Sequence, residues 1–233
     1  MIEPQRSLRC VPKLVIGLLI LSLGLQIIMH HQLPKPQAHI HPLTSPPQVE
    51  LLQVFSLGDP IVSAKMLMLW LQAYGNQAGQ ILSYQQLDYK TLQQWLERIL
   101  RVDPNGQYPL LAASHIYSTV RDSNKQRQML EFIHQQFFID PPQRWRWLAH
   151  ATVLAKHRLK DLPLALKYAK AIAAHANSKM PYWAQEMQIF ILEDMGEFEQ
   201  AQLIIGGMLA NGQLTDPKEI KFLNDKLLAL KPR

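Results

Sequence analysis

Residues that begin helices recur at a fixed distance along the second half of this chain. The pairs expected to open a helix stand 36 residues apart each time: Tyr108-Pro109, Arg144-Trp145, Met180-Pro181 and Asp216-Pro217. A second set, expected where one helix crosses another, has the same spacing: Met129, Ala165 and Ala201. Proline suits a first helical turn, which has no backbone donor to lose. Because two sets of landmarks share one period, the sequence predicts a linear array of helical repeats.

Each repeat is predicted to be a helix, a short turn and a second helix. The expected helix pairs are 109–120 with 124–138, 144–158 with 163–176, and 182–194 with 198–210. A lone helix over 217–230 would cap the array with its lysines. An irregular earlier pair is expected at 60–74 and 88–102, separated by a long loop. The fold class is therefore predicted to be all-α, an α-solenoid of antiparallel helix hairpins with a period of 36 residues, over 50–233.

The turns of these hairpins resemble those of tetratricopeptide-like proteins. The resemblance rests on Gly196-Glu197-Phe198-Glu199-Gln200-Ala201 and on Lys160-Asp161-Leu162 followed by Ala165, although the family's own period is 34 residues. It implies a repeat fold whose first helices line a groove that binds a peptide or protein partner. The combination of Gly58-Asp59-Pro60 with Trp70-Leu71-Gln72 is also similar to membrane-anchored envelope proteins of proteobacteria.

A single long apolar segment lies near the N-terminus. Residues 14–29 carry no charge, and sixteen helical residues cover about 24 Å, somewhat less than the ~30 Å of a hydrocarbon core. A cleaved signal peptide is the alternative, but the segment is longer than a usual signal core and no small-residue cleavage motif follows it. We therefore expect a signal anchor at 14–31, between a basic tail at 1–13 and a linker at 32–49.

The charges beside the anchor predict its orientation. Arg6, Arg9 and Lys13 precede the apolar segment, and only Lys35 follows it closely. Under the positive-inside rule, the N-terminus stays in the cytoplasm and the remainder is exported. The expected location is the bacterial inner membrane, crossed once, with the repeat domain in the periplasm. Either reading of the apolar segment, anchor or signal peptide, places the repeat domain outside the cytoplasm.

The linker at 32–49 is rich in proline, which favours an extended backbone. Four histidines lie in or near it: His30, His31, His39 and His41. Clustered histidines can bind a transition metal, but no carboxylate or cysteine lies among these four. A polar spacer is therefore the favoured interpretation, and neither a metal nor a cofactor is expected.

Charge and cysteine usage exclude several classes of function. The net charge is +6, but half of it lies in the first 43 residues, so the repeat domain has no nucleic-acid-binding signature. Cys10 is the one cysteine, which excludes thiol chemistry in the repeat domain. No phosphate loop, dinucleotide-binding or metalloprotease motif is present. Ser114 and His115 are neighbours on one helix and are expected to point in different directions. The protein is thus predicted not to be an enzyme.

Two neighbouring repeats differ sharply in charge. Residues 144–179 contain eight basic side chains and one acidic, whereas residues 180–216 contain six acidic side chains and no basic one. The two sets could neutralise each other across the stack, where exposed pairs contribute only about 0–1 kcal/mol each. Alternatively, they could form a bipolar surface that orients a partner.

Matching the repeats to the groove of tetratricopeptide-like proteins gives the candidate site. On the middle repeat, these residues are Trp147, His150, His157 and Arg158; on the next, they are Trp183, Glu186, Phe190 and Glu193. Aromatic side chains flanked by charges are typical of binding hot spots, although both tryptophans could instead pack between repeats. The predicted function is a membrane-anchored interaction scaffold of the cell envelope that binds a protein or peptide. The alternative is an accessory factor of an envelope assembly machine, such as cytochrome maturation, polysaccharide export or secretion. The oligomeric state is left open.

Overall fold

The computed structural model describes residues 12–32, 42–55, 58–77, 80–177, 180–212 and 214–230. The described chain is helical apart from one short hairpin, which confirms the all-α class. It divides into two units. One contains the N-terminal helix and the hairpin, and the other contains the remaining helices. Residues 1–11 of the predicted basic tail and residues 33–41 of the predicted linker, which include His39 and His41, lie outside the described residues.

Eleven α-helices are present in the described residues. In chain order they are α1 (Lys13–Gln32), α2 (Val49–Phe55), α3 (Pro60–Ala73), α4 (Tyr89–Val102), α5 (Tyr108–His115), α6 (Ser123–Phe137), α7 (Pro141–His157), α8 (Leu162–Ala174), α9 (Tyr182–Asp194), α10 (Phe198–Ala210) and α11 (Pro217–Ala229). The hairpin pairs β1 (Asn76–Gln77) with β2 (Gln80–Ile81) in antiparallel register. Two 3₁₀ turns, η2 (Tyr84–Gln86) and η3 (Tyr117–Thr119), complete the described elements.

Aspartate side chains fix the starts of many of these helices. Six helices have an aspartate at the N-cap whose carboxylate accepts hydrogen bonds from backbone N–H groups of the first turn: Asp59, Asp88, Asp122, Asp140, Asp161 and Asp216. These N–H groups have no partner inside the helix, and each such cap contributes about 1 kcal/mol. In four of these helices a proline occupies one of the first two positions. The local sequence therefore sets where the helices begin.

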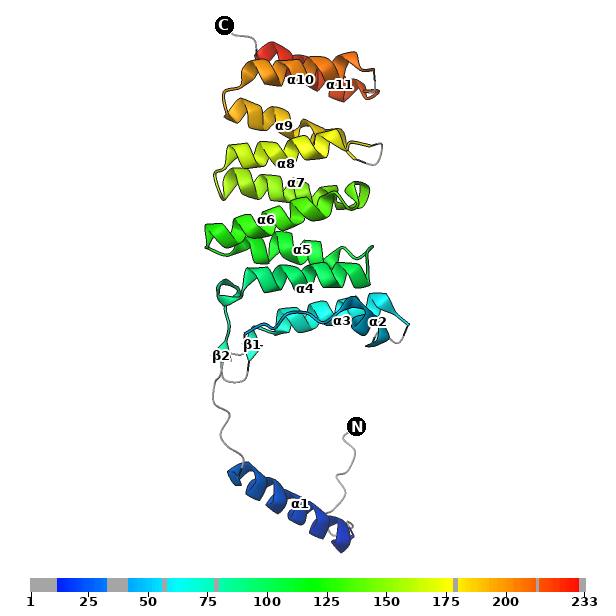
Figure 1. The fold of residues 1–233 in the computed structure, drawn as a ribbon, viewed down its shortest axis with the longest axis vertical. Helices are drawn as coiled ribbons and strands as arrows, with labels where there is room; N and C mark the ends of the chain where they lie inside the picture. Colours follow the sequence, from blue (N-terminus) through cyan, green and yellow to red (C-terminus); the bar gives the residue numbers. More distant parts are fainter. Residues whose placement is uncertain are drawn as a thin grey trace, which may run out of the picture. The chain divides into compact units, whose positions relative to one another are not determined.

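In the larger unit, each helix packs on the next one along the chain. Such contacts join α3 to α4 and continue through every successive pair to α11, and α4 also contacts α6 while α5 contacts α7. Figure 1 shows these helices as successive layers joined by short turns. Short connections of this kind make neighbouring helices antiparallel. In the first part of the stack, α5 therefore lies beside both α3 and α7, and α4 lies beside α6.

The core follows the stack as two clusters. The larger runs from Leu43 to Ile191, and the smaller joins α9, α10 and α11 around residues such as Leu192 and Ile205. The residues expected at the helix crossings, Met129, Ala165 and Ala201, are fully buried. Small residues at two of these positions allow close approach of the helix backbones.

The helix starts differ in part from the expectation. Helices α9 and α10 have the expected bounds, whereas α7 begins at Pro141, three residues before the predicted Arg144-Trp145 pair. The reason is local: Asp140 caps the helix, and Pro141 and Pro142 fit its first turn. The first helices α5, α7, α9 and α11 therefore begin at Tyr108, Pro141, Tyr182 and Pro217, which are not evenly spaced.

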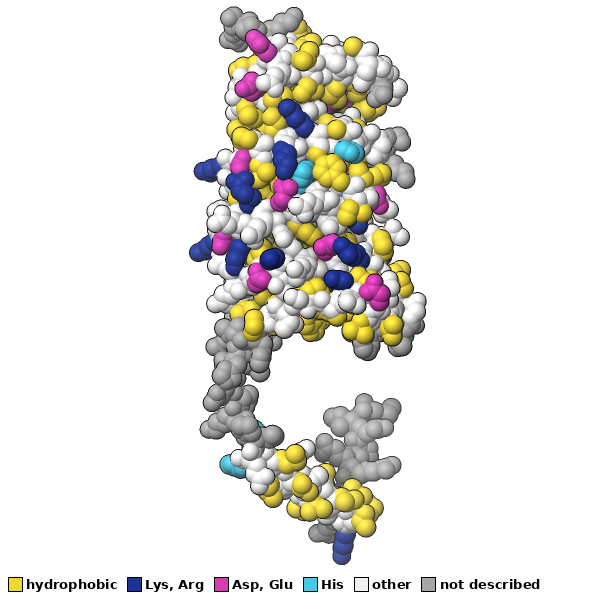
Figure 2. Space-filling model, in the orientation of Figure 1, with side chains coloured by type: hydrophobic (Ala, Val, Ile, Leu, Met, Phe, Trp, Pro, Cys, Tyr) yellow, Lys and Arg dark blue, Asp and Glu magenta, His cyan; other side chains and the backbone are white. Residues whose placement is uncertain are grey.

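Helix α1 is long and apolar enough to cross a membrane. It has 20 residues, a mean hydropathy of 2.0 over its most apolar window, and no buried residue. Figure 2 shows hydrophobic side chains over most of its visible surface. Its bounds extend the predicted span of 14–31 by one residue at each end. His30 and His31 form the last turn of this helix.

Candidate functional site

An aromatic groove lies where α5, α7 and α9 meet. It has a volume of about 420 Å³ and is lined by His115, Trp145, Arg146, Trp147, Ala149, His150, Val153 and Trp183. Most of the lining comes from α7, the first helix of the middle repeat. Helix α5 contributes His115, and α9 contributes Trp183. Three predicted site residues, Trp147, His150 and Trp183, are thus brought together here.

The tryptophans of the groove differ in how firmly they are held. Trp145 is buried, and its ring meets that of Trp183 edge to face at a centroid distance of 5.5 Å. The indole N–H of Trp147 donates a hydrogen bond of 2.6 Å to Gln107 Oε1. Trp183 is 50% exposed. Trp145 and Trp147 therefore form a fixed wall, and Trp183 offers a free ring face to a ligand.

Two stacked imidazole rings form another part of the groove. His115 and His150 lie with their centroids 4.1 Å apart and their planes at 7°. Burial lowers the pKa of His150, and the neighbouring His115 lowers it further, while a hydrogen bond to the Ser114 backbone acts in the opposite direction. His150 is therefore neutral at neutral pH. The neutral ring of His150 presents apolar surface to a ligand and not positive charge.

The expectation that Ser114 and His115 point apart is wrong. Ser114 Oγ lies 2.7 Å from His115 Nδ1, within hydrogen-bonding distance. The helix ends at His115, and the backbone departs from regular helical geometry at the next residue, which lets the two side chains meet. Ser114 is fully buried, and its hydroxyl is also 3.1 Å from the Leu111 carbonyl. The serine thus orients the outermost imidazole of the groove.

His157 and Arg158 lie at the end of α7 and do not line the groove. Both side chains are exposed. Arg158 Nη2 donates a hydrogen bond of 2.8 Å to the Thr119 carbonyl, so it ties η3 to α7. The adjacent Lys156 forms an ion pair with Asp194 of α9. This pair connects the basic and acidic repeats, as the neutralisation alternative requires.

The remaining predicted residues of α9 face the last helix. The Phe190 ring lies 6.3 Å from that of Phe222, with Lys226 Nζ 4.9 Å from its centroid. The same ammonium pairs with Glu193 Oε2 at 2.6 Å. These contacts make Phe190 and Glu193 part of the α9–α11 interface.

Glu186 is also covered at this end of the stack. It is 3% exposed, and Oε1 has no hydrogen-bond partner in the described structure. Burial raises the pKa of Glu186 to about 7, and the charge of Glu219 and a hydrogen bond to it add to that rise. A buried carboxyl in this setting holds its proton up to neutral pH.

Several residues that line the groove were not predicted from the sequence. His115, Trp145 and Val153 line it but were not assigned to the candidate site. His115 precedes His150 by 35 residues, close to the repeat period, and this spacing was an available signal. Trp145 was used only as a helix start.

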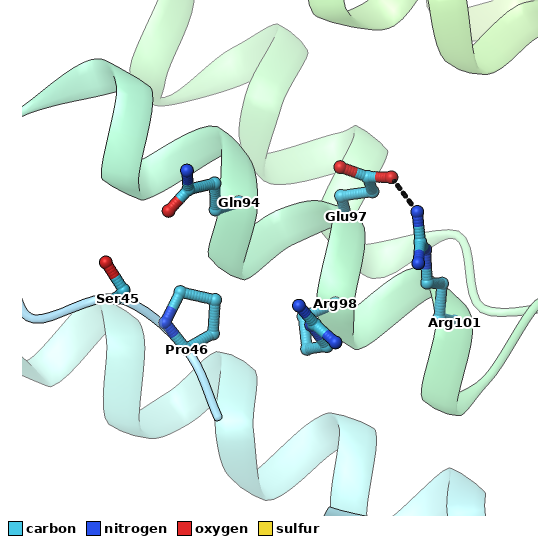
Figure 3. A pocket seen from close by; sticks show the side chains of 6 residues that line it. All are labelled: Ser45, Pro46, Gln94, Glu97, Arg98 and Arg101. Atoms are coloured by element: carbon cyan, nitrogen blue, oxygen red, sulfur yellow. Dashed lines mark hydrogen bonds and ion pairs between the residues drawn. The ribbon is translucent and has the colours of Figure 1, made fainter. Parts of the chain in front are cut away.

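A second, more polar hollow lies where the chain enters the larger unit. It has a volume of about 280 Å³ and is lined by Ser45, Pro46, Gln94, Glu97, Arg98 and Arg101. Figure 3 shows Ser45 and Pro46 beside the side chains of α4, where Arg101 pairs with Glu97 at 2.6 Å. Close by, the indole N–H of Trp95 donates a 2.7 Å hydrogen bond to the Thr44 carbonyl. The incoming segment is therefore fastened to α4.

Among the described residues, no group of three or more His, Cys, Asp or Glu side chains is placed to hold a metal ion. Comparison with known proteins gives no relative: no family model, no curated protein and no solved structure matches this chain. The proposals below therefore rest on the chain's own residues.

Proposed function

We propose that this protein is a membrane-anchored protein–protein interaction scaffold of the bacterial cell envelope. Its helices form a tetratricopeptide-like α-solenoid with a repeat of 36 residues, and its groove binds a peptide segment of an envelope protein. The observation that carries the proposal is the groove of about 420 Å³, in which aromatic rings from three successive first helices converge. Fixed aromatic side chains around a ligand-sized hollow are typical of binding hot spots.

The repeat interpretation is supported by equivalent features in successive units. Crossing residues 36 apart are fully buried, and the first helix α5 contacts the first helices α3 and α7. In such an array each unit packs on its neighbours, which leaves a continuous face for a partner.

The groove favours an extended segment with aromatic or aliphatic side chains beside an acidic one. Trp147, Trp183 and the stacked imidazoles provide apolar surfaces. Arg146 is the one charged residue of the lining, and its guanidinium lies 5.7 Å from the Trp145 ring. Stacked in this way, it remains able to pair with a carboxylate of the partner.

The membrane assignment rests on α1 and its flanking charges. We propose that α1 is retained as an anchor in the inner membrane, with the N-terminus in the cytoplasm and the repeats in the periplasm. Its apolar length and the excess of basic residues before it support this orientation. A reporter fused after Arg233 should then be active outside the cytoplasm and stay with the membrane fraction at high salt. A shortened, soluble product would instead show cleavage.

Site-specific photo-crosslinking in cells tests the binding proposal. A crosslinking side chain replaces Trp183 in the full-length chain, and the matched control replaces Phe138, which is equally exposed at the end of α6 and does not line the groove. The expected result is one dominant adduct from position 183 that position 138 does not give, and that weakens in the Trp147→Ala background. The same adducts from both positions would overturn the groove assignment.

A further inference from the structure

One face of α3 is exposed although it is almost entirely apolar. Its side chains Ile61, Val62, Met66, Leu69 and Trp70 are between 43% and 62% exposed, and we refer to them as the α3 face. The opposite side of the helix, with Ala64, Met68 and Leu71, is buried. A helix that is apolar on both sides is normally covered on both sides. On the drawn side of the larger unit, hydrophobic side chains gather at the α2–α3 end (Figure 2).

The other end of the stack is built differently. The exposed side chains of α11 include the polar Lys218, Lys221, Asn224 and Asp225, which stand beside the exposed Phe222 and Leu228. A polar outer face is what a terminal repeat in water requires. The contrast indicates that the α3 end of the stack faces an apolar medium.

The chain itself indicates which medium this is. Only ten peptide steps separate Gln32, the last residue of α1, from Pro42, and fully extended they reach at most about 35 Å. The following segment is held on α4, because Leu43 is buried and Trp95 Nε1 donates to the Thr44 carbonyl. Figure 3 shows the next residues of this segment against α4. Since α4 also packs on α3, the short tether leads to the end of the stack that carries the α3 face.

We propose that the α3 face rests on the lipid surface of the membrane in which α1 is embedded. The part of the bilayer that the α3 face would contact is its interfacial layer. Trp70 and the neighbouring Tyr74, whose rings meet at 5.4 Å, are the residue types that membrane interfaces favour. Lys65, the one charged residue on this side of α3, can extend its stem along the apolar surface and keep its ammonium among the headgroups. Docking would hold the stack, and hence the groove, in a fixed orientation to the membrane.

The inference goes beyond the proposed function but depends on α1 being embedded, so the test reports on both. Full-length protein with Cys10→Ser receives one new cysteine, Met66→Cys, Leu21→Cys or Leu203→Cys, and an environment-sensitive fluorophore. It is reconstituted into phosphatidylethanolamine–phosphatidylglycerol vesicles with brominated acyl chains. Leu21 reports on α1, and Leu203 is an exposed apolar control on α10. We expect quenching and a blue shift at positions 66 and 21 but not at 203.

Quenching at position 21 without quenching at 66 would overturn the docking and leave the anchor intact. Quenching at neither position would overturn both. A label at 66 that is shielded only as the protein-to-lipid ratio rises, together with disulfide-linked dimers of the unlabelled Met66→Cys protein under an added oxidant, would show that a second copy covers the face. As a second arm, Val62→Glu with Leu69→Glu should abolish quenching at 66 while the circular dichroism stays unchanged, since both side chains are exposed. Undiminished quenching in that folded variant would also overturn the proposal.

Discussion

Lys160 and Gly196 stand 36 residues apart and both adopt a left-handed backbone conformation, with φ of 53° and 77°. Each lies in the turn between the two helices of a hairpin, after α7 and after α9. Glycine adopts this conformation without cost, whereas a side chain makes it unfavourable by roughly 1–2 kcal/mol. The two turns thus share a left-handed backbone at one position but have different residues there, and the middle hairpin carries the side chain that strains it.

The first prediction follows from this difference. Lys160→Gly should raise the stability of the middle hairpin by about 0.5–1 kcal/mol, because relief of the strain exceeds the added entropy of the unfolded chain. Gly196→Ala should lower stability by about 1 kcal/mol. Thermal unfolding of the full-length protein in detergent, followed by circular dichroism, measures both. A Lys160→Gly variant that melts below the wild type would contradict the presence of strain at this position.

The second prediction concerns the crossing of α9 and α10. Ala201 is fully buried in the C-terminal cluster, together with Leu192 and Ile205. Ala201→Trp should destabilise this cluster by about 1–3 kcal/mol, because the indole does not fit into a closely packed core. Hydrogen exchange should show lost protection in α9 to α11 first, with α4 to α6 unaffected. The matched control, Leu203→Trp, changes an exposed neighbour on α10 and should leave protection unchanged.

The third prediction concerns pH. The pKa of Glu186 is raised from its ordinary value of 4.5 to about 7 by burial and by Glu219. The native state therefore holds this proton more tightly than the unfolded chain, and stability falls as pH rises from about 4.5 through 7. Glu186→Gln should remove this loss and raise the melting temperature at pH 8 relative to the wild type. Melting curves at pH 5 and pH 8 test it, with the exposed Glu199→Gln as a control that keeps the wild-type slope.

The fourth prediction separates the two tryptophans of the groove. Trp183→Ala should weaken partner capture and leave the melting temperature unchanged, because half of this side chain is exposed. Trp147→Ala should weaken capture and also lower the melting temperature, because its ring packs against the core and bonds Gln107. Capture is measured by crosslinking yield from position 153 on the same groove. Equal decreases in melting temperature for both variants would show that Trp183 is also a packing residue.

The fifth prediction addresses the basic repeat. Lys156→Glu should lower the melting temperature slightly, by about 0–1 kcal/mol of stability, because the lysine pairs with Asp194 at the surface. Arg158→Glu should in addition slow association with an acidic partner, and the wild-type on-rate should fall as salt is raised. Stopped-flow association with the crosslinked partner, once purified, distinguishes the two effects. A salt-independent on-rate would leave the charges with a stabilising role alone.

The sequence by itself determined most of the helical segments and where many of them begin, but it did not predict α2, and the helix expected over 109–120 ends at His115. Asp-Pro and related helix starts are local properties of the sequence, and so is the length of the apolar segment. Together with the spacing of the crossing residues, the helix starts placed α9 and α10 correctly to the residue. The start of α7 was missed because a local signal competed with the periodicity. The 36-residue spacing pointed to Arg144, but Asp140 with Pro141 and Pro142 is the stronger cap. Local hydrogen bonding therefore overrode the periodicity.

Only the tertiary structure decided which side chains share a surface. A helix turns by about 100° per residue, so an uncertainty of one position in a helix face moves a side chain from a groove to an interface. Glu186, Phe190 and Glu193 were assigned to the groove by matching the repeats to tetratricopeptide-like proteins, and packing against α11 places them elsewhere. His115 entered the groove because α5 ends there and its ring could stack on His150. Which faces remain open depends on the neighbour that packs against each helix, and that neighbour is set by contacts between segments distant in the sequence.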